Sequence, residues 1–285
     1  MAVGIDVGGT SIKAVIADRQ NGSILAELRA RTPAPDPDGE KVCDAVAKLL
    51  TELPGAAGLP VGVVVPGIVD EQRGLAVESA NLSWRDVDLA TLLRSRLGRS
   101  VGLGHDVRAG AIAEARWGAV VGEGGVVAFV PIGTGLAAAI LVDGQPIVAE
   151  GWAGEVGQLR VGSGPHTGKR VEQVASAAAT AERAGEPNAR LVAARVRAGD
   201  QTAARVWGET IEVIAETLAN LTAVTGAHVI VVGGGLALSG SILLDPLDRA
   251  LIARLGALRA PRLLQASLGD RAAALGATLI AELSA

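Results

Sequence analysis

Three glycine-rich turns carry the clearest chemical signal in this sequence. Gly8-Gly9-Thr10 and Gly133-Thr134-Gly135 each follow a short β-rich apolar run, and Gly233-Gly234-Gly235 follows another. Glycine lets backbone amides approach a ligand closely, and a concave set of amides is suited to binding an anion such as a phosphate. For one isolated copy, a tight turn that needs glycine is the simpler interpretation. Because the pattern recurs, anion binding is favoured.

The common nucleotide-binding motifs do not fit these turns. Gly4 and Gly9 have the interval of a Walker P-loop, but Thr10 stands where that motif requires lysine. The dinucleotide-binding pattern GxGxxG also fails after Gly233, because Leu238 occupies its last glycine position. A less common nucleotide fold is therefore needed.

The elements around the first two turns repeat in outline. Strands are expected at 3–7, 12–17 and 24–31, with an Asn21-Gly22 hairpin turn, and again at 126–132, 136–142 and 145–148, with an Asp143-Gly144 turn. Two copies of one antiparallel meander indicate two similar domains that face each other across a cleft.

Helices interleaved with buried strands complete the pattern. Apolar spacing predicts strands at 61–65, 101–103 and 229–232, and helices at 39–53, 89–97, 106–117, 171–184, 187–198, 201–225 and 270–283. This alternation is typical of an α/β fold.

Composition excludes several classes of function. The chain has 285 residues, a formal net charge of −4 and a single cysteine, Cys43. The charge gives no general attraction to nucleic acid or to an anionic membrane, and one cysteine allows neither an internal disulfide nor a multi-cysteine metal site. The first residues lack an export signal, and the longest apolar runs are too short to cross a bilayer. A soluble, cytoplasmic protein is expected.

The glycine turns and their neighbours resemble a known superfamily. DVGGTSIK at 6–13, IGTG at 132–135 and VVGGG at 231–235 are similar to the phosphate and adenosine loops of the actin, hexokinase and heat-shock ATPases. Within that group the chain resembles the ROK family (repressor, open reading frame, kinase) from end to end. The supporting segments are VPGIVD at 65–70, SANLSW at 79–84, HDVRAGAIAE at 105–114 and GEVGQ at 154–158.

The resemblance implies a two-domain actin-like ATPase fold, which is ribonuclease H-like, with a central cleft. The expected domains are a small N-terminal domain at 1–115, joined by a C-terminal helix at 270–285, and a large domain at 116–269. It also implies a homodimer.

The resemblance implies a kinase that uses ATP and magnesium. Phosphoryl transfer to a sugar hydroxyl needs a base at that hydroxyl and a metal on the phosphates. Asp106 is the implied base, although a carboxylate that opens a helix is also an ordinary N-cap. Asp6 is implied to hold Mg²⁺ through water; otherwise it is a polar strand end.

The remaining implied roles concern binding. The residues implied to bind the phosphates are Gly8, Gly9, Thr10, Gly133, Thr134 and Gly135. Lys13 is implied to add positive charge there, unless it faces solvent. Gly234 and Gly235 are implied to contact adenosine. The residues implied to bind the sugar are Gly67, Asn81, His105, Glu155, Gln158 and Glu172. For Glu172, the alternative is that it faces solvent. Carboxylates and amides suit hydroxyl recognition because each can bind two hydroxyls.

Two departures from the family pattern affect these expectations. His105 stands where most members have asparagine, so it either donates to a sugar hydroxyl or is a satisfied core residue. Gln158 replaces a histidine, and the segment 162–172 has none of the family's zinc-binding cysteines. Since His166 alone cannot supply about four ligands, we expect no structural zinc.

The leading hypothesis is an ATP-dependent kinase that phosphorylates a hydroxyl, with O6 expected, of a hexose such as glucose, an amino sugar or a cyclitol. A non-catalytic sugar- or nucleotide-binding regulatory protein of the same fold is the alternative. A DNA-binding repressor is disfavoured because it needs a helix-turn-helix ahead of the first phosphate-loop segment, 6–13, where this sequence has only residues 1–5. Polyphosphate stays open as a second donor.

Overall fold

The structure is a computed structural model that describes residues 1–281. The chain divides into two compact units. Unit 1 comprises Met1–Trp117, Val148–Ala153 and Arg271–Ala285, of which 282–285 lie outside the described residues. Unit 2 comprises Gly118–Ile147 and Gly154–Asp270. The predicted domain boundary, between residues 115 and 116, lies two residues before the division between the units, which follows Trp117. The segment 148–153 lies within the predicted large domain, 116–269, but groups with unit 1.

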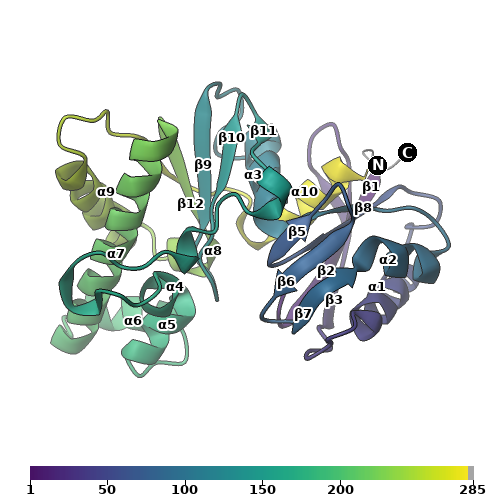
Figure 1. The fold of residues 1–285 in the computed structure, drawn as a ribbon, viewed down its shortest axis with the longest axis horizontal. Coiled ribbons are helices and arrows are strands. Elements are labelled where there is room, and N and C mark those ends of the chain that lie inside the picture. The colour runs from purple at the N-terminus through teal and green to yellow at the C-terminus, as the bar shows by residue number, and fades with distance from the viewer. Residues whose placement is uncertain (282–285) are drawn as a thin grey trace. The chain divides into compact units, whose positions relative to one another are not determined.

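Unit 1 is built on a five-stranded sheet with the order β3-β2-β1-β4-β8. Its strands are β1 (Ala2–Val7), β2 (Ser11–Ala17), β3 (Ile24–Arg31), β4 (Val61–Val65) and β8 (Gly102–His105). The first three form the predicted antiparallel meander, and β4 and β8 run parallel to β1 (Figure 1). The carboxyl ends of β1, β4 and β8 therefore lie at the same edge of this sheet.

Helices cover both faces of this sheet. They are α1 (Glu40–Glu52), α2 (Leu89–Leu97), α3 (Asp106–Trp117) and α10 (Ala272–Ile280). Helices α1 and α2 pack on the alternate strand positions that include Ile5 and Val63, whereas α3 and α10 pack on the face of Val64. The expected helix at 270–285 thus begins at Ala272 and ends at Ile280, and the part at 282–285 lies outside the described residues.

A row of glycines lets α10 lie very close to the sheet. Gly4, Gly62 and Gly102 are paired across β1, β4 and β8. A Cβ atom at each of these positions would lie 1.9–2.3 Å from a carbonyl oxygen of α10. Since real Cβ atoms do not approach oxygen so closely, the row is needed for this packing.

A second, three-stranded antiparallel sheet in unit 1 was not predicted from the sequence. It consists of β5 (Ile68–Asp70), β6 (Leu75–Ser79) and β7 (Trp84–Asp88). The strands are short, and a register shift between Ile68 and Val69 interrupts their alternation. Trp84 and Leu82 nevertheless anchor this sheet in the apolar core of unit 1.

Unit 2 repeats the topology of the main sheet of unit 1. The order is β11-β10-β9-β12-β13, formed by β9 (Val126–Pro131), β10 (Ala139–Val142), β11 (Gln145–Pro146), β12 (Val229–Gly233) and β13 (Arg262–Gln265). As in unit 1, the first three strands are antiparallel and two parallel strands follow. The duplication inferred from the glycine turns is confirmed at the level of the sheets.

Helices α7 (Gln201–Thr225) and α9 (Ser241–Leu255) pack against this sheet in one apolar core (Figure 1). Helix α9 contains Pro246, which lacks the N–H that would otherwise bind the carbonyl of Ile242. Nε1 of Trp207 on α7 donates to that carbonyl at 3.0 Å instead. The proline is therefore accommodated by a hydrogen bond between helices.

Three smaller helices, α4 (Glu172–Ala175), α5 (Ala177–Arg183) and α6 (Ala189–Arg197), complete the described helical layer together with the short α8 (Gly234–Ala237). The prediction of one helix over 171–184 was wrong. Ser176 has extended backbone angles, and its hydroxyl accepts the N–H of Ala179 at 3.1 Å, so it ends α4 and caps α5. Among the described helices, none is long and apolar enough to cross a membrane.

Candidate active site

The first glycine turn joins β1 and β2 and is held by Thr32. The Gly8 amide donates to the carbonyl of Ser11 at 2.9 Å, which closes the turn. Thr32 donates its hydroxyl to the Gly8 carbonyl at 2.6 Å, and its amide donates to the carbonyl of Thr10. Thr10 itself is exposed. The turn thus has a fixed backbone and an accessible hydroxyl, as a phosphate-binding loop requires.

Asp6 and Lys13 flank this turn as direct cross-strand partners. Asp6 is half-buried near the end of β1, and Lys13 is only 6% exposed. Lys13 is therefore not a solvent-facing strand residue. Opposed residues on antiparallel strands have neighbouring side chains, so the two charges influence each other.

Gly67 lies between β4 and the small sheet, and Asn81 lies in the loop between β6 and β7. Gly67 has φ +103°, and a Cβ there would lie 2.1 Å from the carbonyl oxygen of Glu78. Only glycine fits this position. A Cβ on Gly9 would lie 3.1 Å from the Cβ of Asn81, so the structure brings Asn81 against the first glycine turn.

Asp106 is the first residue of α3 and directly follows β8. Its side chain is 26% exposed, and Oδ1 accepts the N–H of Val107 at 2.7 Å. The carboxylate therefore lies at the helix start and is partly exposed. Its bond to Val107 is to the next residue, whereas a capping side chain accepts an N–H two or three residues further on.

His105, the last residue of β8, is 3% exposed, and its Nε2 lies 3.2 Å from Oδ1 of Asp106. Burial, assisted by the positive charge of Arg108, lowers the pKa of His105 to about 3. The Asp106 carboxylate acts in the opposite direction, but desolvation dominates at this depth. The imidazole is consequently neutral at pH 7.

The ion pair between the buried Arg108 and the partly exposed Glu71 was not found by sequence reasoning. Arg108 is 2% exposed; its Nε donates to Oε1 of Glu71 at 2.9 Å and its Nη2 to the Val69 carbonyl at 3.1 Å. The same oxygen of Glu71 accepts the amide of His105 at 3.1 Å. In the sequence, the only sign of this pair was an arginine two residues after Asp106. This pair fixes the junction of β8 and α3.

In unit 2 the second and third glycine clusters lie side by side. The Gly133 amide donates to the carbonyl of Gly135 at 3.0 Å, while Ile132 exchanges backbone hydrogen bonds with Gly233 and Leu236. Gly234 has φ +75°, and a Cβ there would lie 2.5 Å from the Ile132 carbonyl oxygen. By contrast, a Cβ on Gly133 or Gly235 would have no neighbour within 4 Å.

Gln158 and Glu172 meet beside the same turn. Nε2 of Gln158 donates to Oε1 of Glu172 at 3.0 Å, and Glu172 Oε2 lies 3.7 Å from the Cβ position of Gly135. Glu172 is therefore engaged within unit 2 and does not simply face solvent. Glu155 is half-buried and precedes the 3₁₀ turn Val156–Gln158.

The segment 159–171 between Gln158 and Glu172 is tied to α7 by polar contacts that sequence reasoning also missed. Glu209 contacts the side chains of His166, Arg183 and Arg205. About two helical turns further along α7, Glu216 accepts hydrogen bonds from the Gly162 amide at 2.7 Å and from the Ser163 hydroxyl at 2.8 Å. In the described chain, His, Cys, Asp and Glu side chains form no group of three or more suited to a metal.

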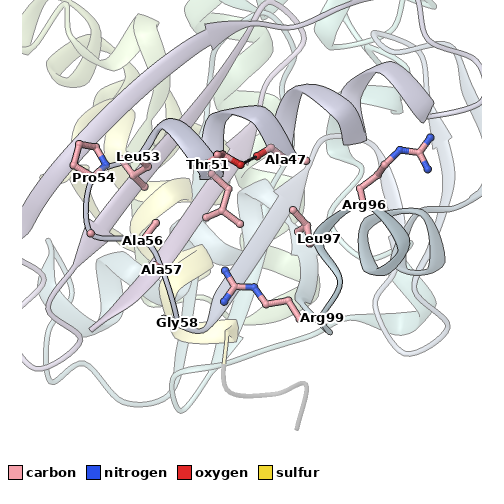
Figure 2. Close-up of a pocket in the computed structure, with 12 residues that line it drawn as sticks. Ala47, Thr51, Leu53, Pro54, Ala56, Ala57, Gly58, Arg96, Leu97 and Arg99 are labelled. Atoms are coloured by element: carbon pink, nitrogen blue, oxygen red, sulfur yellow. Dashed lines mark hydrogen bonds between the residues drawn. The ribbon is translucent and has the colours of Figure 1, made fainter.

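A cavity of about 590 Å³ in unit 1 contains none of the predicted site residues. It lies at the carboxyl end of α1 and is lined by that end, the loop after it and the end of α2 (Figure 2). Arg99 donates to the carbonyl of Leu59 at 2.8 Å, and Arg96 pairs with Glu40 and Asp44. Both arginines are engaged by the chain itself.

The fold of the chain is that of the two-domain actin-like ATPases, with mixed α/β units whose main sheets share one topology. A family model described as "ROK family" matches residues 2–283. The chain therefore belongs to the ROK family.

Three relatives illustrate this membership. A glucokinase of Thermotoga maritima is 27% identical and is matched over 88% of this chain and 86% of its own length. The crystal structure of a ROK family glucokinase from Streptomyces griseus in complex with glucose and AMPPNP superposes with a TM-score of 0.84, at 27% identity and 99% coverage of both chains. An inorganic polyphosphate/ATP-glucomannokinase from Arthrobacter is 32% identical, with a TM-score of 0.75 and coverage of 99% and 98%.

Proposed function

We propose that this protein is an ATP- and magnesium-dependent sugar kinase that phosphorylates a hydroxyl of a hexose such as glucose, or of a related amino sugar or cyclitol, with O6 as the acceptor. The observation that carries the proposal is Asp106: an accessible carboxylate with a fixed Oδ1, at the edge of the sheet that also holds the first glycine turn. The relatives named above, which are kinases of glucose or mannose, support the same assignment.

In the proposed reaction Asp106 takes the proton of the acceptor hydroxyl. The hydroxyl oxygen attacks the γ-phosphorus of ATP, the bond from that phosphorus to the β–γ bridging oxygen breaks, and ADP leaves. Gly67 and Asn81 in unit 1, and Glu155, Gln158 and Glu172 in unit 2, are proposed to bind the sugar. A hydroxyl that pairs with a buried acceptor is selected strongly, because an analogue without it leaves the acceptor unpaired.

ATP is proposed to bind through backbone more than through side chains. The turns Gly8-Gly9-Thr10 and Gly133-Thr134-Gly135 offer amides and hydroxyls to the phosphates, with Lys13 as a nearby positive charge. Gly234 and Gly235 are proposed to face adenosine, where the open space at Gly235 suits close approach of a ring to the backbone.

The residues present fit a magnesium ion that keeps most of its water. Mg²⁺ prefers oxygen ligands and is typically held by one or two carboxylates together with substrate phosphates. Asp6, half-buried at the end of β1, is the proposed carboxylate. Bound there, the ion supplies charge neutralisation on the phosphates. That the protein lacks structural zinc remains a prediction.

A coupled ADP-release assay with ATP and Mg²⁺ tests the proposal. Glucose, mannose, N-acetylated and amino hexoses and cyclitols are the acceptors, and 6-deoxyglucose is the matched control for O6. Turnover on one acceptor class, lost with the 6-deoxy sugar, is expected. ATP and sugar binding without turnover on any acceptor would instead favour the regulatory alternative.

Replacing ATP by polyphosphate in the same assay tests the donor. The similarity to the Arthrobacter enzyme is the reason for this test of the donor.

We propose that the protein is a homodimer and that it is cytoplasmic. Light scattering on the purified chain tests the assembly, and cell fractionation tests the location. We propose no nucleic-acid or membrane partner.

A further inference from the structure

His105 contacts the proposed base directly. Its Nε2 lies 3.2 Å from Oδ1 of Asp106, and the Val107 amide binds the same oxygen at 2.7 Å. Two groups on one carboxylate oxygen restrict rotation of the carboxylate. With 3% of its surface exposed, His105 offers little area to a ligand.

The protonation state of His105 determines what this contact is. A carboxylate only accepts hydrogen bonds, so a neutral imidazole must carry its proton on Nε2 to donate to Asp106. Nδ1 is then an acceptor; it is buried and has no hydrogen-bond partner within residues 1–281. The pKa of His105, lowered to about 3 by burial and by Arg108, keeps the ring neutral at physiological pH.

The charged groups that face His105 hold it in place. Glu71 accepts the His105 amide at 3.1 Å and pairs with Arg108, and Arg108 also binds the Val69 carbonyl. These contacts fix the backbone of His105 through Glu71, which directly follows β5, and through Arg108 of α3. The imidazole is therefore attached to a fixed backbone beside Asp106.

We propose that His105 is a positioning residue for Asp106, whose neutral Nε2–H holds the carboxylate in the orientation that receives the acceptor proton, and that it is not a sugar ligand. This inference rests on the proposed kinase function for its kinetic consequence. It replaces the sequence-based hypothesis that His105 donates to a sugar hydroxyl. The contact itself can be tested without any activity.

Nitrogen NMR of the ¹⁵N-histidine-labelled chain is the first test. The protein has three histidines, at 105, 166 and 228, so single substitutions assign the signals. We expect His105 to show a neutral ring with the proton on Nε2 from pH 5 to 8, and the Asp106→Asn variant to shift the Nε2 resonance. A proton on Nδ1, titration in this range, or no response to Asp106→Asn would overturn the inference, whatever the protein's activity.

Kinetics of two variants then distinguish positioning from sugar binding. His105→Phe preserves bulk but removes the donor, and we expect kcat to fall about 10- to 100-fold with the KM for sugar changed less than about threefold. His105→Gln, whose amide can donate, should recover part of kcat. A rise in sugar KM with kcat retained would overturn the proposal in favour of a sugar contact. Thermal melting of both variants separates these effects from misfolding.

Discussion

Unit 1 and unit 2 contain main sheets of one topology that carry different chemistry at corresponding strand ends. Strand β4, the fourth in the order of its sheet, leads into Gly67 and the small second sheet, whereas its counterpart β12 leads into Gly234 and α8. The last parallel strand, β8, ends at His105 and leads directly into Asp106 of α3, but its counterpart β13 ends at Gln265.

The difference lies in the groups that the two sheets carry at these strand ends. Unit 1 carries the Asp106 carboxylate beside His105, whose amide binds the Glu71 carboxylate of the Arg108–Glu71 pair. Unit 2 supplies mainly backbone amides and glycine surfaces, beside the Gln158–Glu172 pair. A shared topology therefore predicts where a site lies but not its chemistry, which depends on the residues placed there.

Among the variants considered, Asp106→Asn should cause the largest loss of activity. Asparagine keeps the shape of the side chain but cannot take a proton, so we expect kcat to fall about 10²- to 10⁴-fold while sugar binding is retained. The coupled assay and calorimetric titration with sugar measure the two effects.

The control is Asp143→Asn in the hairpin turn of unit 2. Asp143 has φ 49°, a conformation that asparagine tolerates, and Oδ1 accepts the Gly125 amide at 2.7 Å, which an asparagine oxygen can also do. Full activity is expected of this variant. Retention of activity within tenfold of wild type by Asp106→Asn would contradict the assignment of the base.

Gly67→Ala and Gly234→Ala test whether the two units share a steric requirement after the corresponding strands β4 and β12. Both residues have positive φ, and the added Cβ would lie 2.1 Å and 2.5 Å from carbonyl oxygens. Gly58 has φ +75° with nothing within 4 Å of a Cβ, so Gly58→Ala isolates the backbone cost alone, about 1–2 kcal/mol. Chemical denaturation should show clearly larger losses for the other two variants. Equal losses in all three would mean that the clashes relax.

The elements of this comparison could be predicted from sequence where the signal is local. Alternating β-rich runs separated by Asn21-Gly22 and Asp143-Gly144 gave both meanders, and apolar spacing gave α7 with its bounds at Gln201 and Thr225. Helix α9 was not predicted. It contains Pro246, and the bond that compensates for the missing N–H comes from Trp207, 35 residues away from Ile242.

The candidate site was predictable as residue types but not as contacts. The motifs indicated Asp106, Gln158 and Glu172, whereas the pairing of Arg108 with Glu71 joins residues 37 apart, and that of His166 with Glu209 joins residues 43 apart. Such contacts depend on how strands and helices pack, which no local pattern encodes. The assigned roles of the site residues stay predictions until the variants are measured.

Gly235→Ala tests the proposed contact of adenosine with the backbone of unit 2. Its Cβ enters open space, so stability should match wild type, unlike that of Gly234→Ala. If adenosine lies against this backbone, the added methyl group should raise the KM for ATP about tenfold and leave the KM for sugar unchanged. Steady-state kinetics with each substrate varied in turn measures this, and an unchanged ATP KM would place adenosine elsewhere.

Glu209→Gln tests the smallest expected effect, the support of the Gln158–Glu172 pair from α7. Burial raises the pKa of Glu209, but the hydrogen bond from His166 and the charges of Arg205 and Arg183 outweigh it and lower the pKa below 4.5 overall. The carboxylate therefore stabilises the folded protein at neutral pH, and this contribution is lost as the pH falls from about 4.5 through the folded-state pKa.

The variant should lose about 1–2 kcal/mol of unfolding free energy at pH 7 and progressively less as the pH approaches the folded-state pKa. Its KM for sugar should rise a few-fold, because the segment that joins Gln158 to Glu172 is held less firmly. Glu212→Gln on the same helix is the control, since Glu212 is 57% exposed and pairs only at the surface with Arg254. Denaturation curves at pH 4, 5 and 7 measure the dependence. If both variants behaved alike, the firm hold on the segment would have to come from Glu216 and its bonds to Gly162 and Ser163.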